Sequence, residues 1–171
     1  RLGPRRLAAL ISPSVYYQVK AKRLSHLAGF LVSHYGGRPA KMLRSDPDEL
    51  RKDLLSVHGI GPETADSIML YATGHPMFVV DTYTRRIFGR HGMVAENDSY
   101  HDLQRMFHEH LPRDPRLFNE YHALIVRLGK ECCTKTAPRC SGCPLQGFPQ
   151  HDRECSPAKI LKLPTRLHKI L

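Results

Sequence analysis

An isolated carboxylate follows an apolar run in the middle of the sequence. Met77, Phe78, Val79 and Val80 form a strand-like run, Asp81 comes next, and Thr82, Tyr83, Thr84, Arg85 and Arg86 follow. An aspartate between a buried run and a helical pattern is commonly a helix N-cap. In a partly apolar site, beside a bound phosphate and two arginines, the same carboxylate could stabilise a cationic sugar or activate water. Both roles stay open for Asp81 at this point.

A glycine-rich turn lies upstream of that carboxylate. His58-Gly59-Ile60-Gly61 separates two helical patterns, and Pro62 fits the first position of the second helix, where its missing amide costs nothing. Glycines allow backbone angles that are closed to other residues. The amides at the start of a helix and the positive end of its dipole can bind one phosphate. The alternative is a turn that only joins two helices, because a G-x-G pattern is a weak signal by itself.

Charge and hydropathy point to a polyanionic partner. The 171 residues include 26 Lys and Arg against 16 Asp and Glu, a net charge of +10. A surplus of this size predicts salt-sensitive binding to nucleic acid, and a generic basic surface is the alternative. No apolar run is long enough for a bilayer, and no signal peptide is apparent. We therefore expect a cytoplasmic, nucleoid-associated protein without a membrane partner.

Apolar residues recur at helical spacing along most of the chain. Helices are expected over residues 5–11, 17–35, 45–57, from 62 onward, 82–91, 99–111 and 117–128. Ser99 and Asp102 resemble a capping box. No convincing alternating strand is present, so the sequence predicts an all-α fold.

The five cysteines are clustered between Cys132 and Cys155. An odd number of clustered cysteines, in a chain without a secretion signal, favours metal or cluster binding over a disulfide framework. Six residues separate Cys133 from Cys140, and two separate Cys140 from Cys143. Four thiolates could hold an iron–sulfur cluster or a zinc ion.

The stretch L-x-x-V-x-G-I-G-P-E-T-A-D, followed by V-V-D-T-Y-T-R-R, closely resembles the helix-hairpin-helix DNA glycosylases of the endonuclease III superfamily. The resemblance extends from about Tyr16 to Cys143. It implies that the hairpin grips the DNA backbone and that Asp81 is the catalytic carboxylate. The expected DNA contacts are His58, Gly59, Ile60, Gly61, Thr64, Arg85, Arg86, Lys135 and Arg139.

The same resemblance implies two helical lobes. Residues 16–111 would form the lobe with the helix-hairpin-helix motif, and residues 1–15 with 112–171 the lobe that bears the cluster. The family's upstream helices are expected to be missing from the sequence as given. The implied partner is duplex DNA containing a damaged base, bound by a monomer.

Position 63 holds a glutamate where some family members have a lysine, and this difference determines which mechanism is expected. Bifunctional members carry a lysine there, whose amine forms an imine with the sugar; a carboxylate cannot do so. The hairpin is more similar to the monofunctional branch that removes 3-methyladenine. We therefore expect base removal by water without efficient strand cutting, with Glu63 assigned to the catalytic site by its position. The alternatives are a bifunctional endonuclease III-type enzyme for oxidised pyrimidines and a catalytically inactive DNA-binding homologue.

The cysteine spacing matches the first three ligands of the family's four-iron, four-sulfur cluster. These are Cys133, Cys140 and Cys143. The last gap is longer than in the family, with eleven residues before Cys155. Because closure entropy grows slowly with loop length, Cys155 is the expected fourth ligand. Cys132 is the spare thiol, and zinc is the alternative metal.

Overall fold

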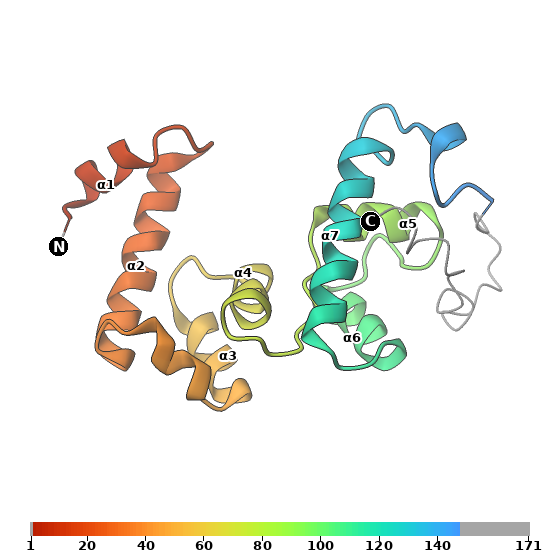
Figure 1. The fold of residues 1–171 in the computed structure, drawn as a ribbon. Helices are drawn as coiled ribbons and strands as arrows, with labels where there is room; N and C mark the ends of the chain where they lie inside the picture. The colour runs from red at the N-terminus through yellow and green to blue at the C-terminus, as the bar shows by residue number, and fades with distance from the viewer. Residues whose placement is uncertain (1, 148–171) are drawn as a thin grey trace. The chain divides into compact units, whose positions relative to one another are not determined.

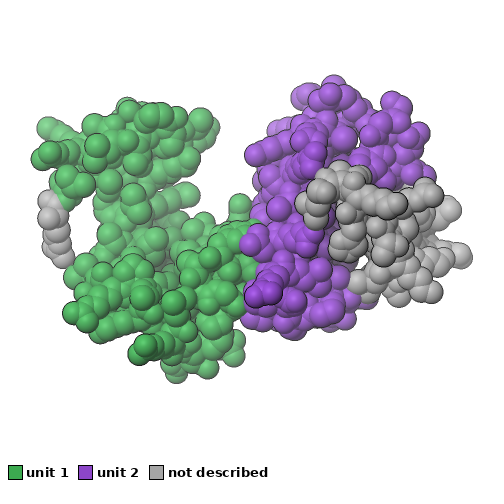
Figure 2. Space-filling view, in the orientation of Figure 1, with its two compact units in different colours: residues 1–75 green, residues 76–171 purple. Residues whose placement is uncertain are grey.

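The computed structural model describes residues 2–147, which are largely helical (Figure 1). Among those residues no β-strand forms, which confirms the predicted all-α class. The chain divides into two compact units, residues 1–75 and 76–171, each described by itself (Figure 2). The expected grouping of residues 1–15 with 112–171 stays a prediction. Within the described part, no helix is long and apolar enough to cross a bilayer.

Unit 1 consists of helices joined by short turns. They are α1 (Pro4–Leu10), α2 (Tyr17–Tyr35), a 3-10 helix η1 (Pro39–Arg44), α3 (Pro47–Ser56) and α4 (Pro62–Ser67), which continues into a π-helical turn, η2 (Ile68–Ala72). Helix α2 ends at Gly36 in the left-handed conformation, with φ of 60°. Helix α3 begins after Asp46, whose side chain accepts two backbone N–H bonds. These local signals place both helix ends close to where the sequence predicts them.

A buried ion pair joins α3 to α4. The guanidinium of Arg51 donates to both carboxylate oxygens of Asp66, at 2.6 and 3.1 Å. The side chain of Asp66 is fully buried. Because a bidentate pair fixes distance and orientation together, it sets the geometry of the two helices that flank the glycine turn.

Unit 2 is organised around α7. Its described elements are α5 (Thr82–Arg90), α6 (Tyr100–His110), α7 (Pro115–Glu131) and a 3-10 helix η3 (Cys140–Gly142). The predicted capping box at Ser99 and Asp102 is present. Helices α5 and α7 lie against one another, and the Tyr83 ring packs on Gly129 so closely that an added Cβ would overlap it. The glycine therefore permits this helix contact.

The strand-like apolar run before Asp81 is buried and, in agreement with the predicted all-α class, forms no strand. Side chains of α6 pair with its backbone instead. The Phe78 N–H donates to Nε2 of His108 at 3.0 Å, and the amide of Gln104 donates to the Phe78 carbonyl at 2.8 Å. The Phe78 ring stacks on Phe107, with the ring centroids 3.7 Å apart. Because buried backbone groups need partners of any kind, helix side chains can replace a neighbouring strand.

Candidate active site, glycine hairpin and cysteine cavity

The glycine turn between α3 and α4 is tightly packed on one side. Gly59 has φ of 88°, a conformation that side-chain-bearing residues rarely adopt. An added Cβ there would lie 2.5 Å from Cγ of Arg23, on α2. Nδ1 of His26, also on α2, lies 3.2 Å from the His58 carbonyl oxygen. Helix α2 therefore packs against the hairpin at His58 and Gly59. A glycine is required at position 59 by this packing and by the positive φ.

Gly61 is in a different situation. Its backbone is extended, with φ of −95° and ψ of 178°, and an added Cβ would meet nothing within 4 Å. The residue between the two glycines, Ile60, has a buried side chain, and its N–H donates to the Val57 carbonyl at 3.0 Å. Ile60 thus anchors the turn in the core. The chain itself supplies no steric reason for a glycine at position 61.

Asp81 is the N-cap of α5, in unit 2. Its Oδ1 accepts the Thr84 N–H at 2.7 Å and the Thr84 hydroxyl at 2.9 Å. The carboxylate is only 11% exposed. The N-cap interpretation is thus correct in geometry, and it uses one of the two carboxylate oxygens.

The second oxygen of Asp81 faces another helix. Nε2 of His122, on α7, lies 3.4 Å from Oδ2, and the His122 side chain is 13% exposed. Burial would raise the pKa of Asp81, but the contact with His122 and the hydrogen bonds from Thr84 outweigh it, so the pKa lies below its ordinary value. The carboxylate is therefore ionised at neutral pH, as stabilisation of a cationic sugar requires.

The two arginines after Asp81 are held by backbone carbonyls. Arg85 donates to the Asp98 carbonyl at 2.6 Å. Arg86 donates to the carbonyls of Cys133 and Gly129, at 2.8 and 2.9 Å. Both guanidinium groups therefore have a part in the fold of unit 2, and their expected DNA contacts stay predictions.

Glu63, predicted to belong to the catalytic site, and the remaining predicted DNA contacts lie at the surface. Glu63 and Thr64, in the first turn of α4, are exposed, and so are His58, Lys135 and Arg139. A first-turn carboxylate such as Glu63 suits the positive end of the helix. Their roles toward DNA stay predictions.

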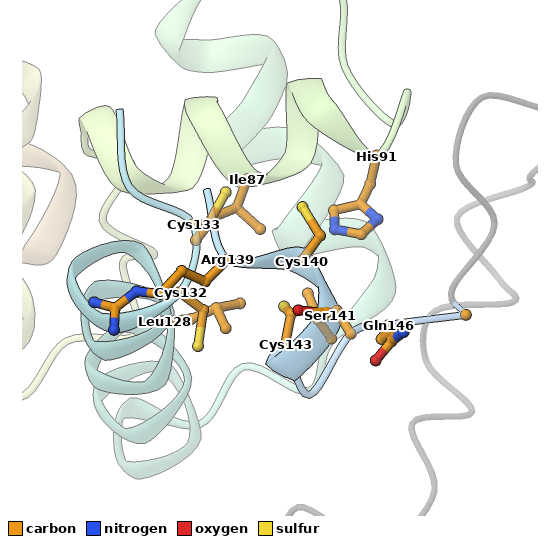
Figure 3. Close-up of a pocket in the computed structure, with 12 residues that line it drawn as sticks. Ile87, His91, Leu128, Cys132, Cys133, Arg139, Cys140, Ser141, Cys143 and Gln146 are labelled. Carbon is orange, nitrogen blue, oxygen red and sulfur yellow. The ribbon is translucent and has the colours of Figure 1, made fainter. Parts of the chain in front are cut away.

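Four cysteines line one cavity of about 500 Å³ in unit 2 (Figure 3). They are Cys132, Cys133, Cys140 and Cys143, and none of these four forms a disulfide. Burial raises the pKa of the Cys143 thiol, and the three neighbouring thiols raise it further. His91 and Arg139 also line the cavity.

The donor set of this cavity fits a thiolate-bound group. Thiolates are the ligands of iron–sulfur clusters and of structural zinc. As placed, no three Cys, His, Asp or Glu side chains of the described residues are grouped to hold a single metal ion. The predicted fourth ligand, Cys155, lies outside the described residues. Cys132, predicted to be the spare thiol, lines the same cavity as the three predicted ligands.

The structure also shows two residues, Arg90 and His122, that contact the candidate sites and that sequence analysis did not find. Arg90 donates to Sγ of Cys133 at 3.2 Å and to the carbonyls of Thr134 and Lys135, and so fixes the start of the cysteine loop. His122 was assigned no role from sequence. The only sequence signal for it is a polar residue within the apolar pattern of residues 117–128, which does not reveal the partner.

Comparisons with known proteins agree with these features. Residues 1–113, which contain the hairpin and Asp81, match the model of the HhH-GPD superfamily base excision DNA repair protein. A protein of Methanocaldococcus jannaschii named as a DNA repair glycosylase is 44% identical over 145 residues, 84% of this chain and 65% of that protein. The chain therefore spans less than two thirds of that relative's length.

Two solved structures have a similar fold. One is a trapped covalent intermediate of endonuclease III with DNA, with a TM-score of 0.71, 24% identity and coverage of 86% of this chain and 64% of that one. The other is the 3-methyladenine DNA glycosylase of H. pylori bound to 1,N6-ethenoadenine, with a TM-score of 0.64, 27% identity and coverage of 76% and 64%. With the family match across both the hairpin and the carboxylate, the chain belongs to the HhH-GPD superfamily of base excision DNA repair proteins.

Proposed function

We propose that this chain is the core of a DNA glycosylase that removes a damaged base from duplex DNA by hydrolysis. The observation that carries the proposal is Asp81, a shielded and ionised carboxylate at the N-terminus of α5, in a chain of the base excision repair superfamily. The glycosidic bond is unreachable inside the stack, so the damaged nucleotide must first rotate out of the duplex.

The reaction follows from the charge of Asp81. As the bond between C1′ and the base nitrogen breaks, the electron pair leaves with the base and the sugar becomes cationic. The ionised Asp81 stabilises that cation and orients a water molecule. The water oxygen bonds to C1′ and loses a proton. This proton passes to the base when the base departs as an anion, and to solvent when a cationic alkylated base departs neutral. The products are the free base and an abasic site.

Glu63 supports a monofunctional reaction. It occupies the position where bifunctional members carry the amine that attacks the sugar, and a carboxylate forms no imine. The H. pylori protein of similar fold is named as a 3-methyladenine DNA glycosylase. We therefore propose alkylated purines as the substrate class, with oxidised pyrimidines and a bifunctional enzyme as the rival.

The hairpin is proposed to hold the DNA backbone. Gly61 precedes the first turn of α4, and the space beside it is open, so a phosphate oxygen can approach the backbone there more closely than any side chain would allow. The net charge of +10 favours the same partner.

A four-iron, four-sulfur cluster is proposed at the cysteine cavity, with zinc as the alternative. Cys133, Cys140 and Cys143 would hold it, with Cys155 as the fourth thiolate. When bound, the group would cross-link the cysteine loop to the end of α7. In this way it would present Lys135 and Arg139 toward DNA phosphates.

Incubation with defined duplexes tests the activity. Duplexes with one alkylated purine, one oxidised pyrimidine or one uracil are incubated with the protein, and abasic sites are revealed by alkali. We expect alkali-dependent cleavage at alkylated purines and none with Asp81→Asn. Asparagine is as good an N-cap as aspartate, so this variant removes the charge and keeps the helix start. Equal activity of the variant would contradict the proposed role of Asp81, and no activity in the parent would favour the inactive DNA-binding homologue.

Borohydride trapping separates the two enzymatic alternatives. A monofunctional enzyme forms no imine, so no covalent adduct with the damaged duplex is expected. An adduct would instead support the bifunctional rival, with an amine other than residue 63.

Cofactor content is tested on the full chain purified without oxygen. Iron and acid-labile sulfide in equal amounts, with broad visible absorption, are expected. A colourless zinc-containing protein would support the alternative. Comparison of Cys155→Ser with Cys132→Ser identifies the fourth ligand, because only the true ligand variant loses iron.

A further inference from the structure

The two carboxylate oxygens of Asp81 are held by different helices. Oδ1 accepts from Thr84 of its own helix α5, at 2.7 and 2.9 Å, and Oδ2 faces Nε2 of His122 on α7, at 3.4 Å. We infer that His122 is a positioning residue that keeps Asp81 ionised and holds its second oxygen in one orientation. The inference rests on the proposed glycosylase function, because it assigns a task to the same carboxylate.

Helix capping does not require a partner for the second oxygen. Asp46 and Asp114 also cap helices, each through its Oδ1, and both are exposed. Asp81 differs because it is shielded and because a side chain from a distant part of the sequence approaches its Oδ2. Water can solvate the charge of an exposed cap, whereas a shielded carboxylate depends on protein groups for its ionised form.

The geometry defines which nitrogen of His122 must carry a proton to stabilise Asp81. An ionised carboxylate only accepts hydrogen bonds, so the form of His122 that stabilises it is the one with a proton on Nε2. A distance of 3.4 Å is longer than an ordinary N–H···O bond, and the contact is therefore mainly electrostatic.

The position of His122 is set by the packing of α7 on α5. Gly129, two turns further along α7, allows the Tyr83 ring to approach, and Arg86 donates to the Gly129 carbonyl. These contacts hold the helix that carries His122 against the helix that begins after Asp81. The imidazole is thus placed by the fold of unit 2 itself.

The other ionisable groups on the helices next to Asp81 form hydrogen bonds with other partners or stay neutral. On α5, Arg85 and Arg86 donate to backbone carbonyls. On α7, burial raises the pKa of Tyr121 to about 12, so this neighbour of His122 stays neutral. On α6, the Tyr100 hydroxyl accepts the Val80 N–H at 3.4 Å.

Another side chain of α6, His108, accepts the Phe78 N–H through its Nε2. Because those groups interact elsewhere or stay neutral, His122 is the ionisable side chain that contacts Asp81 and can change its pKa. Without His122, only the hydrogen bonds from Thr84 would oppose the effect of burial, so the pKa of Asp81 would rise.

Direct titration of Asp81 tests the inference without any assay of activity. The carboxyl carbon of Asp81 is followed by ¹³C NMR against pH in the full chain, with Asp81→Asn used for assignment. In His122→Phe, which keeps a ring of similar size but removes the donor, we expect the pKa of Asp81 to rise. In His122→Gln, which keeps a neutral donor, we expect a smaller rise. An unchanged titration in both variants would overturn the inference.

Single-turnover base excision gives the second readout. We expect His122→Phe to slow excision by about ten- to 100-fold, the range for loss of one charge-assisted contact. Its activity should fall off at a higher pH on the acid side than that of the parent, because protonated Asp81 cannot stabilise a cation. His122→Gln should recover most of the rate, and His101→Gln, on the exposed surface of α6, should match the parent.

The two readouts separate the possible failures. A parent protein that excises no base contradicts the proposed function, while the titration still shows whether His122 controls Asp81. Equal slowing in the Phe and Gln variants, with an unchanged pKa of Asp81, would instead assign His122 a purely structural role and overturn the inference.

Discussion

The hairpin of unit 1 and the carboxylate of unit 2 are built in opposite ways. In the hairpin, side chains such as Arg23 and Ile60 support the turn, and the backbone next to Gly61 is left accessible. At Asp81 a side chain is the proposed functional group, and backbone and side chains of two helices hold it. Binding of a uniform phosphate backbone needs only main-chain groups, whereas charge stabilisation needs one carboxylate in one position.

This difference predicts different responses to substitution. Substitutions of residues that support the hairpin, such as Arg23, should lower stability. Substitution of Gly61, next to the accessible backbone, should lower DNA affinity. Changes around Asp81 should act on the rate of the chemical step. The rate effect is tested by the Asp81 and His122 variants above. Four further substitutions test the supporting contacts of both units and the accessible side of the hairpin, beginning with the largest expected effect.

Arg51→Ala should strongly destabilise unit 1. It removes the bidentate partner of the fully buried Asp66, and loss of one member of a buried pair costs about 3–5 kcal/mol. Chemical denaturation measures the change in the free energy of unfolding. As a control, Arg51→Met combined with Asp66→Leu should recover much of the loss, because it removes both charges. A change below 1 kcal/mol for Arg51→Ala would contradict the structural importance of the pair.

Gly129→Ala should destabilise unit 2 by about 1–3 kcal/mol, because its Cβ would overlap the Tyr83 ring and push α7 from α5. Gly89→Ala is the matched control, since Gly89 lies in α5 with open space around its Cβ position. That control should stabilise the protein by about 0.5–1 kcal/mol. Thermal melting measures the change in Tm of both variants. Similar changes in both would contradict the proposed overlap between a Cβ at position 129 and the Tyr83 ring.

Gly59→Ala should cost about 1–2 kcal/mol from its positive φ alone, with an added cost from overlap with Arg23. Gly36→Ala has a positive φ and open space, so it isolates the backbone cost. The difference in the free energy of unfolding between the two variants measures the contact with α2. Arg23→Ala in the Gly59→Ala background should remove that difference, and a persistent difference would exclude Arg23 as its source.

Gly61→Ala should have the smallest effect on folding, within about 0.5 kcal/mol, because its φ is ordinary and the space beside it is open. Its affinity for duplex DNA should nevertheless fall several-fold, because a methyl group would occupy the position proposed for phosphate. Fluorescence anisotropy at two salt concentrations measures the loss. Unchanged affinity would remove Gly61 from the proposed DNA interface.

Local signals made much of the fold predictable from sequence. The end of α2 at Gly36, the start of α4 at Pro62 and the box at Ser99 and Asp102 each depend on residues within one helical turn. The glycine turn and Asp81 were likewise found because their pattern is continuous in the sequence.

Features that depend on distant partners were not predictable. The run at Phe78 has the pattern of a strand, and only the side chains of α6 show that it needs no neighbouring strand. Likewise, His122 has no local mark that connects it with Asp81, because the contact exists only when α7 packs on α5.

The π-helical turn at Ile68–Ala72 determines the direction in which the chain leaves the hairpin's second helix. A helix turns by about 100° per residue, so the wider turn behaves as an inserted residue that rotates everything after it. Deletion of one residue here would restore regular helix and leave the first turn of α4 unchanged, but the backbone would then leave the helix at Thr73 in a different direction.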